Sequence, residues 1–397
     1  MITTNTFGNR SRQVLTTLVA LLCMGSLLGG CAQAQSRMQA KAVKDMQEVR
    51  TKAAWKQRRI MYNDDGLHTS PYTTPDELIA LRLKQLVGTQ VDTIAYCTGG
   101  GSLFWGHQPQ AGELLGEFVT EKDSQHLKDI CSSLQALKDQ GTDPLAVAVD
   151  FGHTHGMEVF WSYRMNNIED SFALNYLSRW KREHPEYLLG KQEDYAKYPM
   201  TDPHKWWAGL NFEEPEVRDY ILRIFEDVFT RYDIDGVDMD WFRHPRFFPE
   251  TTEELPVTPE HIAMMNDFVR KVHALSVKVS AKRGRPLLVH CRVPLSVERC
   301  LAIGLDVPTW LKEGWVDILT FGGDLGPMAM APQLETMVDL AHKHNVPAMA
   351  NIGGSGLQPG TGYYTDEAWW GAATNAWNVG VEGIYTFNLF PVEPEPQ

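Results

Sequence analysis

Short apolar runs alternate with longer amphipathic segments along most of this chain. Eight apolar runs have the length and composition of buried strands: residues 59–63, 92–97, 158–163, 236–241, 287–292, 316–321, 347–352 and 383–388. Helical patterns separate most of these runs, most clearly at residues 215–232, 259–282, 332–345 and 365–379. This alternation predicts βα units and a parallel sheet.

The number of strands favours a closed barrel over an open sheet. Eight strands are what an α/β protein of the (β/α)8 TIM-barrel type requires. A doubly wound sheet more often has fewer strands and a GxGxxG turn after the first, and no such turn follows residues 59–63. Few residues follow the last predicted strand, so we expect the eighth helix to be missing or replaced by a helix that precedes the first strand.

The first 30 residues form a different kind of segment. Arg10 and Arg12 precede an apolar run at residues 14–28, which is short for a membrane span, and the run ends in Leu-Gly-Gly-Cys at Cys31. This ending resembles a bacterial lipoprotein signal, which implies cleavage before Cys31 and lipidation of its thiol. We therefore expect a signal peptide at 1–30, a tether and helix at 31–57, and one barrel domain at 58–397 in the cell envelope.

Composition and charge narrow the possible partners. Hydrophobic residues make up 43% of the chain and charged residues 22%, which is typical of a globular protein. The net charge is −13, and without residues 1–30 the remaining 35 Lys/Arg and 50 Asp/Glu give −15. No basic run is present, so nucleic-acid binding is not expected.

Three long segments follow predicted strands and therefore belong to the carboxyl-terminal face, where barrel enzymes build their sites. They span residues 98–118, 166–212 and 353–364. Tryptophans in or beside such loops are candidates to stack on sugar rings, whereas most of the others are expected in the core. The candidates are Trp105, Trp206, Trp207 and Trp241.

The strongest chemical signal is the fourth predicted strand. Alternate side chains of a strand share a face, so Asp238 and Asp240 are expected to point into the barrel, with Asp240 nearer its mouth. Inward carboxylates are costly unless they are paired or used in chemistry. The alternatives are therefore a catalytic Asp240 and an ion-paired core strand, in which the partner is Arg243 or Arg292. Arg243 and His244 follow directly and would influence the ionisation of Asp240.

Two segments resemble a known family. Residues 59–66, RIMYNDDG, and residues 235–245, DGVDMDWFRHP, are similar to those of the family 10-like glycosyl hydrolases, and the resemblance covers about residues 58–390. It implies a barrel and, less directly, action on sugars. The second segment is also similar to the DGxDxDxE signature of chitinase-type enzymes, but Phe242 stands where the acidic Glu belongs. This departure argues against the chitinase mechanism.

Glycoside cleavage usually needs two carboxyl groups that flank the scissile bond. If Asp240 is one of them, the first candidate for its partner is Asp324, which follows the sixth strand, and Asp64 or Asp65 after the first strand is the alternative. Polar residues at other strand ends are candidates to bind sugar hydroxyls. They are Arg164, Asn166, His290, Arg292 and Asn388.

These observations lead to three hypotheses of unequal weight. The first is a glycoside hydrolase that acts outside the cytoplasm on a poly- or oligosaccharide, and the second is a non-catalytic carbohydrate-binding lipoprotein that lost the acid. A metal-dependent hydrolase is the third, but the pair His153 and His155 precedes a strand and so lies away from the expected site. No metal ion or other cofactor is expected.

Overall fold

The computed structural model describes residues 46–67, 70–199, 202–322, 331–353 and 365–387. The chain divides into two compact units, residues 1–49 and residues 50–397, and the second unit is described below. Within the described ranges, no helix combines the length and the apolar character needed to cross a bilayer.

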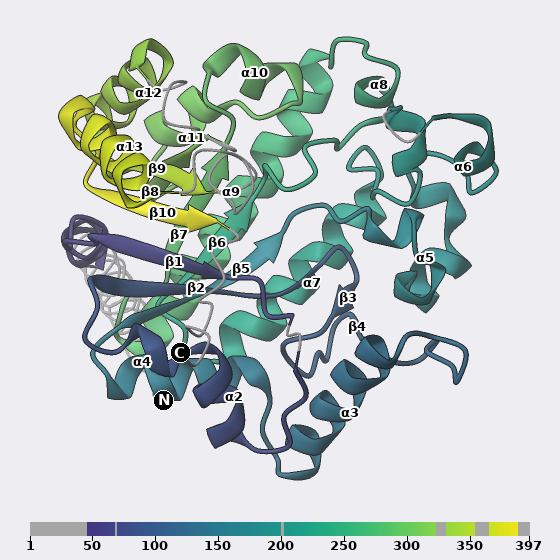
Figure 1. The fold of residues 1–397 in the computed structure, drawn as a ribbon. Helices are drawn as coiled ribbons and strands as arrows, with labels where there is room; N and C mark the ends of the chain where they lie inside the picture. Colours follow the sequence, from purple (N-terminus) through teal and green to yellow (C-terminus); the bar gives the residue numbers. More distant parts are fainter. Residues whose placement is uncertain (1–45, 68–69, 200–201, 323–330, 354–364, 388–397) are drawn as a thin grey trace, which may run out of the picture. The chain divides into compact units, whose positions relative to one another are not determined.

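Eight parallel strands form a closed ring (Figure 1). Each strand pairs with the next in sequence, and β1 pairs with both β2 and β10, which closes the barrel. The ring comprises β1 (Ile60–Asp64), β2 (Val91–Gly100), β5 (Glu158–Arg164), β6 (Gly236–Asp240), β7 (Leu288–Val293), β8 (Ile318–Phe321), β9 (Ala348–Gly353) and β10 (Gly383–Phe387). Two short strands, β3 (Leu103–Phe104) and β4 (Glu113–Leu114), extend β2 into the loop that follows it. The predicted (β/α)8 barrel is confirmed.

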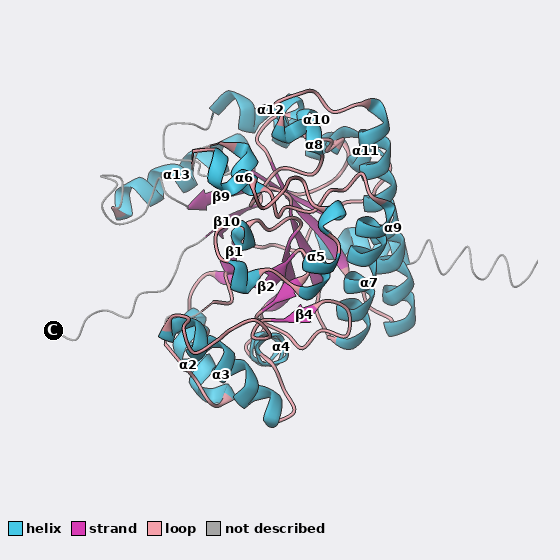
Figure 2. Cartoon of the chain, turned by 90° about the vertical axis from the view of Figure 1, so that its right-hand side faces the viewer, coloured by secondary structure: helices cyan, strands magenta, loops and turns pink. Residues whose placement is uncertain are grey.

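Helices surround the strands (Figure 2). The longer ones are α2 (Pro75–Arg82), α3 (Gln125–Asp139), α4 (Pro144–Thr154), α7 (Pro215–Arg231), α9 (Pro259–Arg283), α12 (Ala331–Lys343) and α13 (Asp366–Val379). Shorter α-helices are α5 (Arg179–Glu183), α6 (Asp194–Lys197), α8 (Pro249–Thr252), α10 (Val297–Ala302) and α11 (Val307–Lys312). The 3₁₀ turns in the described ranges are η1 (Lys84–Leu86), η2 (Glu169–Ser171), η3 (Leu174–Tyr176), η4 (Pro185–Tyr187) and η5 (Pro203–Trp206).

Local sequence explains where the helices begin and end. Pro215 and Pro259 occupy first-turn positions, where a missing N–H does no harm. Thr258 caps α9 through a reciprocal capping box with His261, and Gly284 ends the same helix in the left-handed conformation. The four helices predicted most clearly are confirmed to within two residues at each end.

The barrel interior is built in layers. In the lowest layer, Phe160, Gly236 and Leu288 are register partners on adjacent strands. Phe160 and Leu288 belong to an apolar cluster that also contains Met61 and Met349. Gly236 is required here, because a Cβ at this position would lie 2.2 Å from an atom of the Phe160 ring. The aromatic ring therefore takes the space that a side chain on β6 would occupy.

Residues 50–54 are helical and close the bottom of the barrel. Ala54 is 3% exposed and joins the apolar cluster of the lowest layer. Arg50 forms a buried ion pair with Asp317, which precedes β8, and also donates to Ser276 of α9. This segment packs beneath the interior side chains, so it does not run along the outside of the sheet as an eighth helix would.

Candidate active site

A polar layer lies above the apolar one. Ser162, Asp238 and His290 are register partners on β5, β6 and β7, and all three side chains are buried. The hydroxyl of Tyr385 donates to Asp238 Oδ2 over 2.8 Å. His290 Nδ1 lies 2.9 Å from Asp238 Oδ1, and its Nε2 lies 2.7 Å from the hydroxyl of Thr320.

The surroundings of Asp238 hold it in the charged form. Burial raises the pKa of this carboxyl group, but the electrostatic interaction with His290 and the hydrogen bonds from His290, Tyr385 and Ser162 outweigh burial, so the pKa lies below its usual value. Since the residue has no exposed surface, it supports the layer above it and does not reach the mouth.

The next layer is charged and lies at the carboxyl-terminal mouth. Arg164, Asp240 and Arg292 are register partners, so their charges alternate across three adjacent strands. Arg292 makes a bidentate ion pair with Asp240, in which Nε lies 3.0 Å from Oδ1 and Nη2 lies 2.9 Å from Oδ2. Both side chains are almost completely buried, at 1% and 3% exposure.

The two oxygens of Asp240 differ in their environments. Oδ1 also accepts the backbone N–H groups of Phe242 and Arg243, each over 3.0 Å. Within the described part of the chain, Oδ2 accepts only from Arg292. Oδ2 is therefore the oxygen with capacity left for a substrate or a water molecule. Phe242, which replaces the chitinase Glu, lies against the guanidinium of Arg292, 5.5 Å from the ring centroid.

A second group of charges lies beside this pair. Arg164 forms ion pairs with Asp65, which follows β1, and with Glu169, which follows β5. Glu169 also pairs with Arg243 over 3.0 Å. Burial raises the pKa of Glu169, but Arg164 and Arg243 together lower it below its ordinary value. Glu169 is thus an ionised, half-buried carboxylate at the same mouth as Asp240.

Glu169 was not among the residues predicted from sequence. The signal available was its position five residues after the end of β5, in a loop at the carboxyl-terminal face. The same reasoning predicted Asp65 after β1. Glu169 was not predicted because the loop after β5 is long and contains many polar residues, any of which could have been the one at the mouth.

Asn351 on β9 is a further residue that the sequence analysis missed. It alternates with Met349, which belongs to the interior cluster, so its side chain points into the barrel. It has no exposed surface, and neither its oxygen nor its nitrogen has a hydrogen-bond partner among the described residues. A buried amide in this state is costly, which makes it a candidate to bind a ligand group.

Asp64, the other carboxylate predicted at the end of β1, does not lie at the barrel mouth. Asp64 has no exposed surface and forms a two-pronged ion pair with Arg82 of α2, with Nη2 2.5 Å from Oδ1. Its side chain therefore faces the helices, one position away from Asn63, which donates to Ser162 inside the barrel. Of the two aspartates predicted there, Asp65 contacts the charged group at the mouth.

The tryptophans predicted to stack on sugars lie mostly in the core. Trp241 and Trp207 pack in the main hydrophobic cluster, and Trp105 packs in a smaller one, where Arg164 lies 5.1 Å from its ring centroid. None of these three is more than 4% exposed. Trp206 differs, because it is half-buried and lines a pocket.

His244 and Asn166 hold loops in place. Asn166 donates to the carbonyl groups of Leu210 and Arg246 and so joins the loops after β5 and β6. His244 is 9% exposed, and burial, together with Arg243 and Arg164, holds its pKa well below the usual value. The imidazole is thus neutral.

The long loop after β5 is fixed by a buried cation. Lys181 Nζ lies 2.7 Å from both Asp170 Oδ2 and the carbonyl oxygen of Ala208, and 3.2 Å from that of Asn167. These groups come from the two ends of the loop and from its middle, so one ammonium group ties the whole loop together. We call this arrangement the Lys181 clamp.

Three predicted residues lie outside the described part of the chain. They are Asp324, Asn388 and Cys31.

Part of the chain matches a known protein family. Residues 124–254 match the model of the family described as "Glycosyl hydrolase-like 10". The match runs from the start of α3 to the loop after α8, and it includes Arg164, Glu169 and Asp240. The resemblance predicted from the sequence is confirmed for this segment.

A particular relative is the "Glycosyl hydrolase YngK" of Bacillus subtilis (strain 168). It is 33% identical over an alignment of 214 residues, and the match covers 46% of this chain. The match covers 39% of the relative, so this chain spans about two fifths of the length of the curated relative.

Solved structures show more distant likenesses. The glycoside hydrolase domain of PgaB (BpsB) from Bordetella bronchiseptica aligns with a TM-score of 0.48 and 10% identity, over 84% of this chain and 94% of that one. The GH113 β-mannanase AaManA from Alicyclobacillus acidocaldarius aligns with a TM-score of 0.45 and 12% identity, over 86% and 90%. At these scores neither likeness carries an argument, and the barrel rests on the strand pairing described above.

Proposed function

We propose that this protein is a glycoside hydrolase that cleaves a poly- or oligosaccharide with two carboxyl groups at the barrel mouth. The observation that carries the proposal is the position of Asp240. It ends β6 inside the segment that matches the glycosyl hydrolase-like family, and the strand delivers it to the face on which barrel enzymes build their sites.

Asp240 is proposed as the nucleophile or general base. Either role needs an ionised carboxylate, and the ion pair with Arg292 requires that form. Oδ1 is held by two backbone N–H groups and by Arg292, which fixes the orientation of the carboxylate and leaves Oδ2 as the reacting atom. Arg164 and Arg292 on the adjacent strands would orient the sugar hydroxyls.

The general acid must carry a proton, whereas the ion pairs with Arg164 and Arg243 favour the ionised form of Glu169, so this residue is not proposed as the acid. Glu169 is instead proposed to hold Arg164 and Arg243 in place. Asp324 remains the proposed acid on the basis of sequence alone, since it follows the end of β8 by three residues. Asp65 is the alternative, and its ion pair with Arg164 would have to break for it to donate a proton.

The test measures reducing ends released from a panel of polysaccharides by the wild type and by Asp240→Asn. We expect Asp240→Asn to lower turnover at least about a thousandfold. Asp240→Glu tests position separately, because it keeps the charge but moves the oxygens. Asp92→Asn, a change to a partly exposed carboxylate at the amino-terminal end of β2, away from the mouth, is the control and should keep full activity. Full activity in Asp240→Asn would refute the role.

The alternative function is carbohydrate binding without catalysis. It is favoured by the 3% exposure of Asp240 and by its ion pair, which together resemble a structural core more than a reactive group. A binding protein would be retarded in gels that contain the polysaccharide, yet would release no reducing ends from it.

We also propose that the protein works outside the cytoplasm, held by a lipid on Cys31. The support is the sequence of residues 10–31. Labelling of the cells with a radioactive fatty acid would test this, and Cys31→Ser should abolish incorporation.

A further inference from the structure

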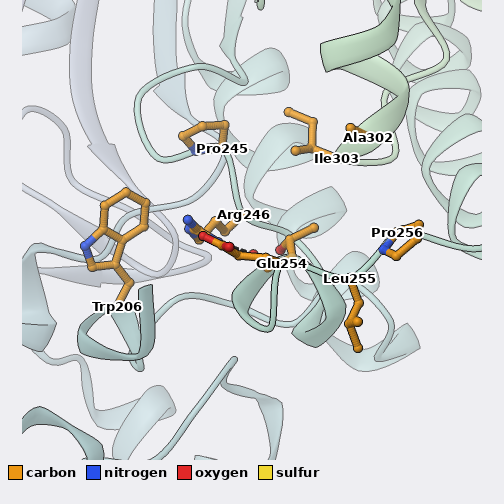
Figure 3. A pocket seen from close by; sticks show the side chains of 9 residues that line it. Trp206, Pro245, Arg246, Glu254, Leu255, Pro256, Ala302 and Ile303 are labelled. Atoms are coloured by element: carbon orange, nitrogen blue, oxygen red, sulfur yellow. Dashed lines mark hydrogen bonds between the residues drawn. The ribbon is translucent and has the colours of Figure 1, made fainter. Parts of the chain in front are cut away.

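A pocket of about 530 Å³ opens on the carboxyl-terminal face beside the barrel mouth (Figure 3). Loops that follow three adjacent strands form its walls, and its volume is typical of small-molecule sites. Trp206 comes from the loop after β5, and Ala302 and Ile303 lie at the end of α10, in the segment after β7. The loop after β6 supplies the rest: Pro245, Arg246, Thr251, Glu254, Leu255 and Pro256.

Arg246 and Trp206 form one wall together. The guanidinium carbon of Arg246 lies 4.9 Å from the centroid of the Trp206 ring, and Nη1 donates to the carbonyl oxygen of Thr251. The Nε–H of Arg246 is buried, and it has no hydrogen-bond partner in the described ranges. The wall thus carries an unused donor beside an aromatic ring.

Glu254 occupies a position that favours glycine. Its φ is 55°, in the left-handed region, two residues after the end of α8, and the next residue, Leu255, donates its N–H to the carbonyl oxygen of Glu250 over 2.8 Å. Helix ends with this bond usually have glycine at the left-handed position, because a Cβ is strained there. Within the described part of the chain, the carboxylate of Glu254 makes no hydrogen bond or ion pair. The left-handed turn ends α8, but the glutamate side chain adds no hydrogen bond to it among the described residues, and strained positions of this kind are frequent in functional sites.

The chemistry of the walls fits a sugar. Arginine only donates hydrogen bonds and an ionised glutamate only accepts them, whereas each sugar hydroxyl does both. Adjacent hydroxyls can therefore accept from Arg246 and donate to Glu254. Trp206 offers apolar surface to the C–H face of the ring, and Leu255, which is 56% exposed, adds an apolar side chain on the other side of Arg246 (Figure 3). Because the walls carry one positive and one negative side chain, neither an anion nor a cation is favoured as the ligand.

We infer that this pocket is a second carbohydrate subsite, which binds one neutral sugar residue of a polymeric substrate away from the cleavage point. The inference rests on the proposed hydrolase function. Pro245 follows Asp240 by five residues on the same loop, so a chain held in the mouth can continue over this loop into the pocket.

The first test uses native gels that contain a neutral polysaccharide, one each with β-glucan, galactomannan and xylan. We expect at least one polymer to retard the wild type, Trp206→Ala to bind it roughly three- to tenfold more weakly, and Trp206→Phe to recover part of the loss. Leu174→Ala removes an exposed apolar side chain (42%) outside the pocket and is the matched control. The inference is overturned if no polymer retards the wild type, or if Trp206→Ala migrates as the wild type does.

The second test separates strain from binding at Glu254. Glu254→Gly should raise the Tm by roughly 1–2 °C and weaken binding of the same polymer severalfold. Asn345→Gly is the matched control, because Asn345 has φ 57° and the next residue, Val346, donates to the carbonyl oxygen of Ala341 in the same arrangement. It should leave binding and hydrolysis unchanged. A Glu254→Gly protein that is more stable and binds as well as the wild type would overturn the inference.

The two proposals fail in different ways. If the wild type releases no reducing ends while retardation still depends on Trp206, the hydrolase proposal fails and the subsite stands. If hydrolysis depends on Asp240 but retardation does not depend on Trp206, the subsite fails alone.

Discussion

The ion pair between Arg292 and Asp240 makes a quantitative prediction about stability. Removing one partner of a buried pair costs about 3–5 kcal/mol, because the other charge stays buried without compensation. Both residues here keep part of their environment. Asp240 retains two backbone N–H groups after Arg292→Met, and Arg292 retains the ring of Phe387, 3.9 Å from its guanidinium carbon, after Asp240→Asn. We therefore expect about 3 kcal/mol for each single change.

The double variant should lose little more than either single one, because no unpaired charge remains. A double-mutant cycle measures this coupling. It compares the urea unfolding of the wild type, the two single variants and the double variant, followed by tryptophan fluorescence. We expect the two changes to couple by about 2–3 kcal/mol.

A matched exposed pair provides the control. Arg59 pairs with Asp92 in the same two-pronged geometry, with Nε 2.9 Å from one oxygen and Nη2 2.6 Å from the other, but the arginine is 46% exposed. The cycle of Arg59→Met with Asp92→Asn should show much weaker coupling. Additive losses at Arg292 and Asp240, with no coupling beyond that of the control, would refute the view that burial gives this pair its strength.

Three further predictions concern the barrel interior. Gly236→Ala should destabilise the protein by about 1–3 kcal/mol in urea unfolding, because its Cβ meets the Phe160 ring, whereas Gly371→Ala in α13, with open space around the new Cβ, should be neutral or stabilising. The pKa of Asp238 is lower in the folded protein than in the unfolded chain, so its stabilisation is present above about pH 4 and is lost as the pH falls. Asp238→Asn should therefore flatten the dependence of Tm on pH between about 3 and 5, and an unchanged slope would contradict this assignment. Asn351→Leu should raise stability by about 1 kcal/mol by removing a buried amide that has no partner among the described residues, yet lower turnover on the polysaccharide that the wild type hydrolyses; equal turnover would show that Asn351 binds no substrate.

The barrel was predictable because its strands are buried on both faces and so form continuous apolar runs. Period-two alternation also placed Asp238, Asp240, His290 and Arg292 inside the barrel, and the structure has them there. The sequence also predicts Arg292 as one of two possible ion-pair partners of Asp240, and the structure shows this pair. Sequence could not decide between them, because strand register across the barrel depends on long-range pairing.

The rest of the site depends on loops. Glu169 reaches the mouth only through the path of the segment after β5, which no periodicity records. Trp206 and Trp207 are neighbours in sequence, yet one lines a pocket and the other is 4% exposed in the core. The direction of each side chain in an irregular segment is set by its tertiary contacts. The sequence therefore predicted tryptophans that could stack on sugar rings, but not which of the candidate tryptophans lines a pocket.

The Lys181 clamp has a consequence for how a substrate is admitted. The bonds of Lys181 to Asp170, Asn167 and Ala208 are buried. An outward movement of the loop after β5 would break them and leave a buried charge without its partner, which is energetically costly. We therefore expect this side of the barrel mouth to be rigid and to have the same shape with and without a ligand. The loop would then select ligands by shape complementarity to a preformed surface. Little conformational entropy of the loop would be lost when the ligand binds.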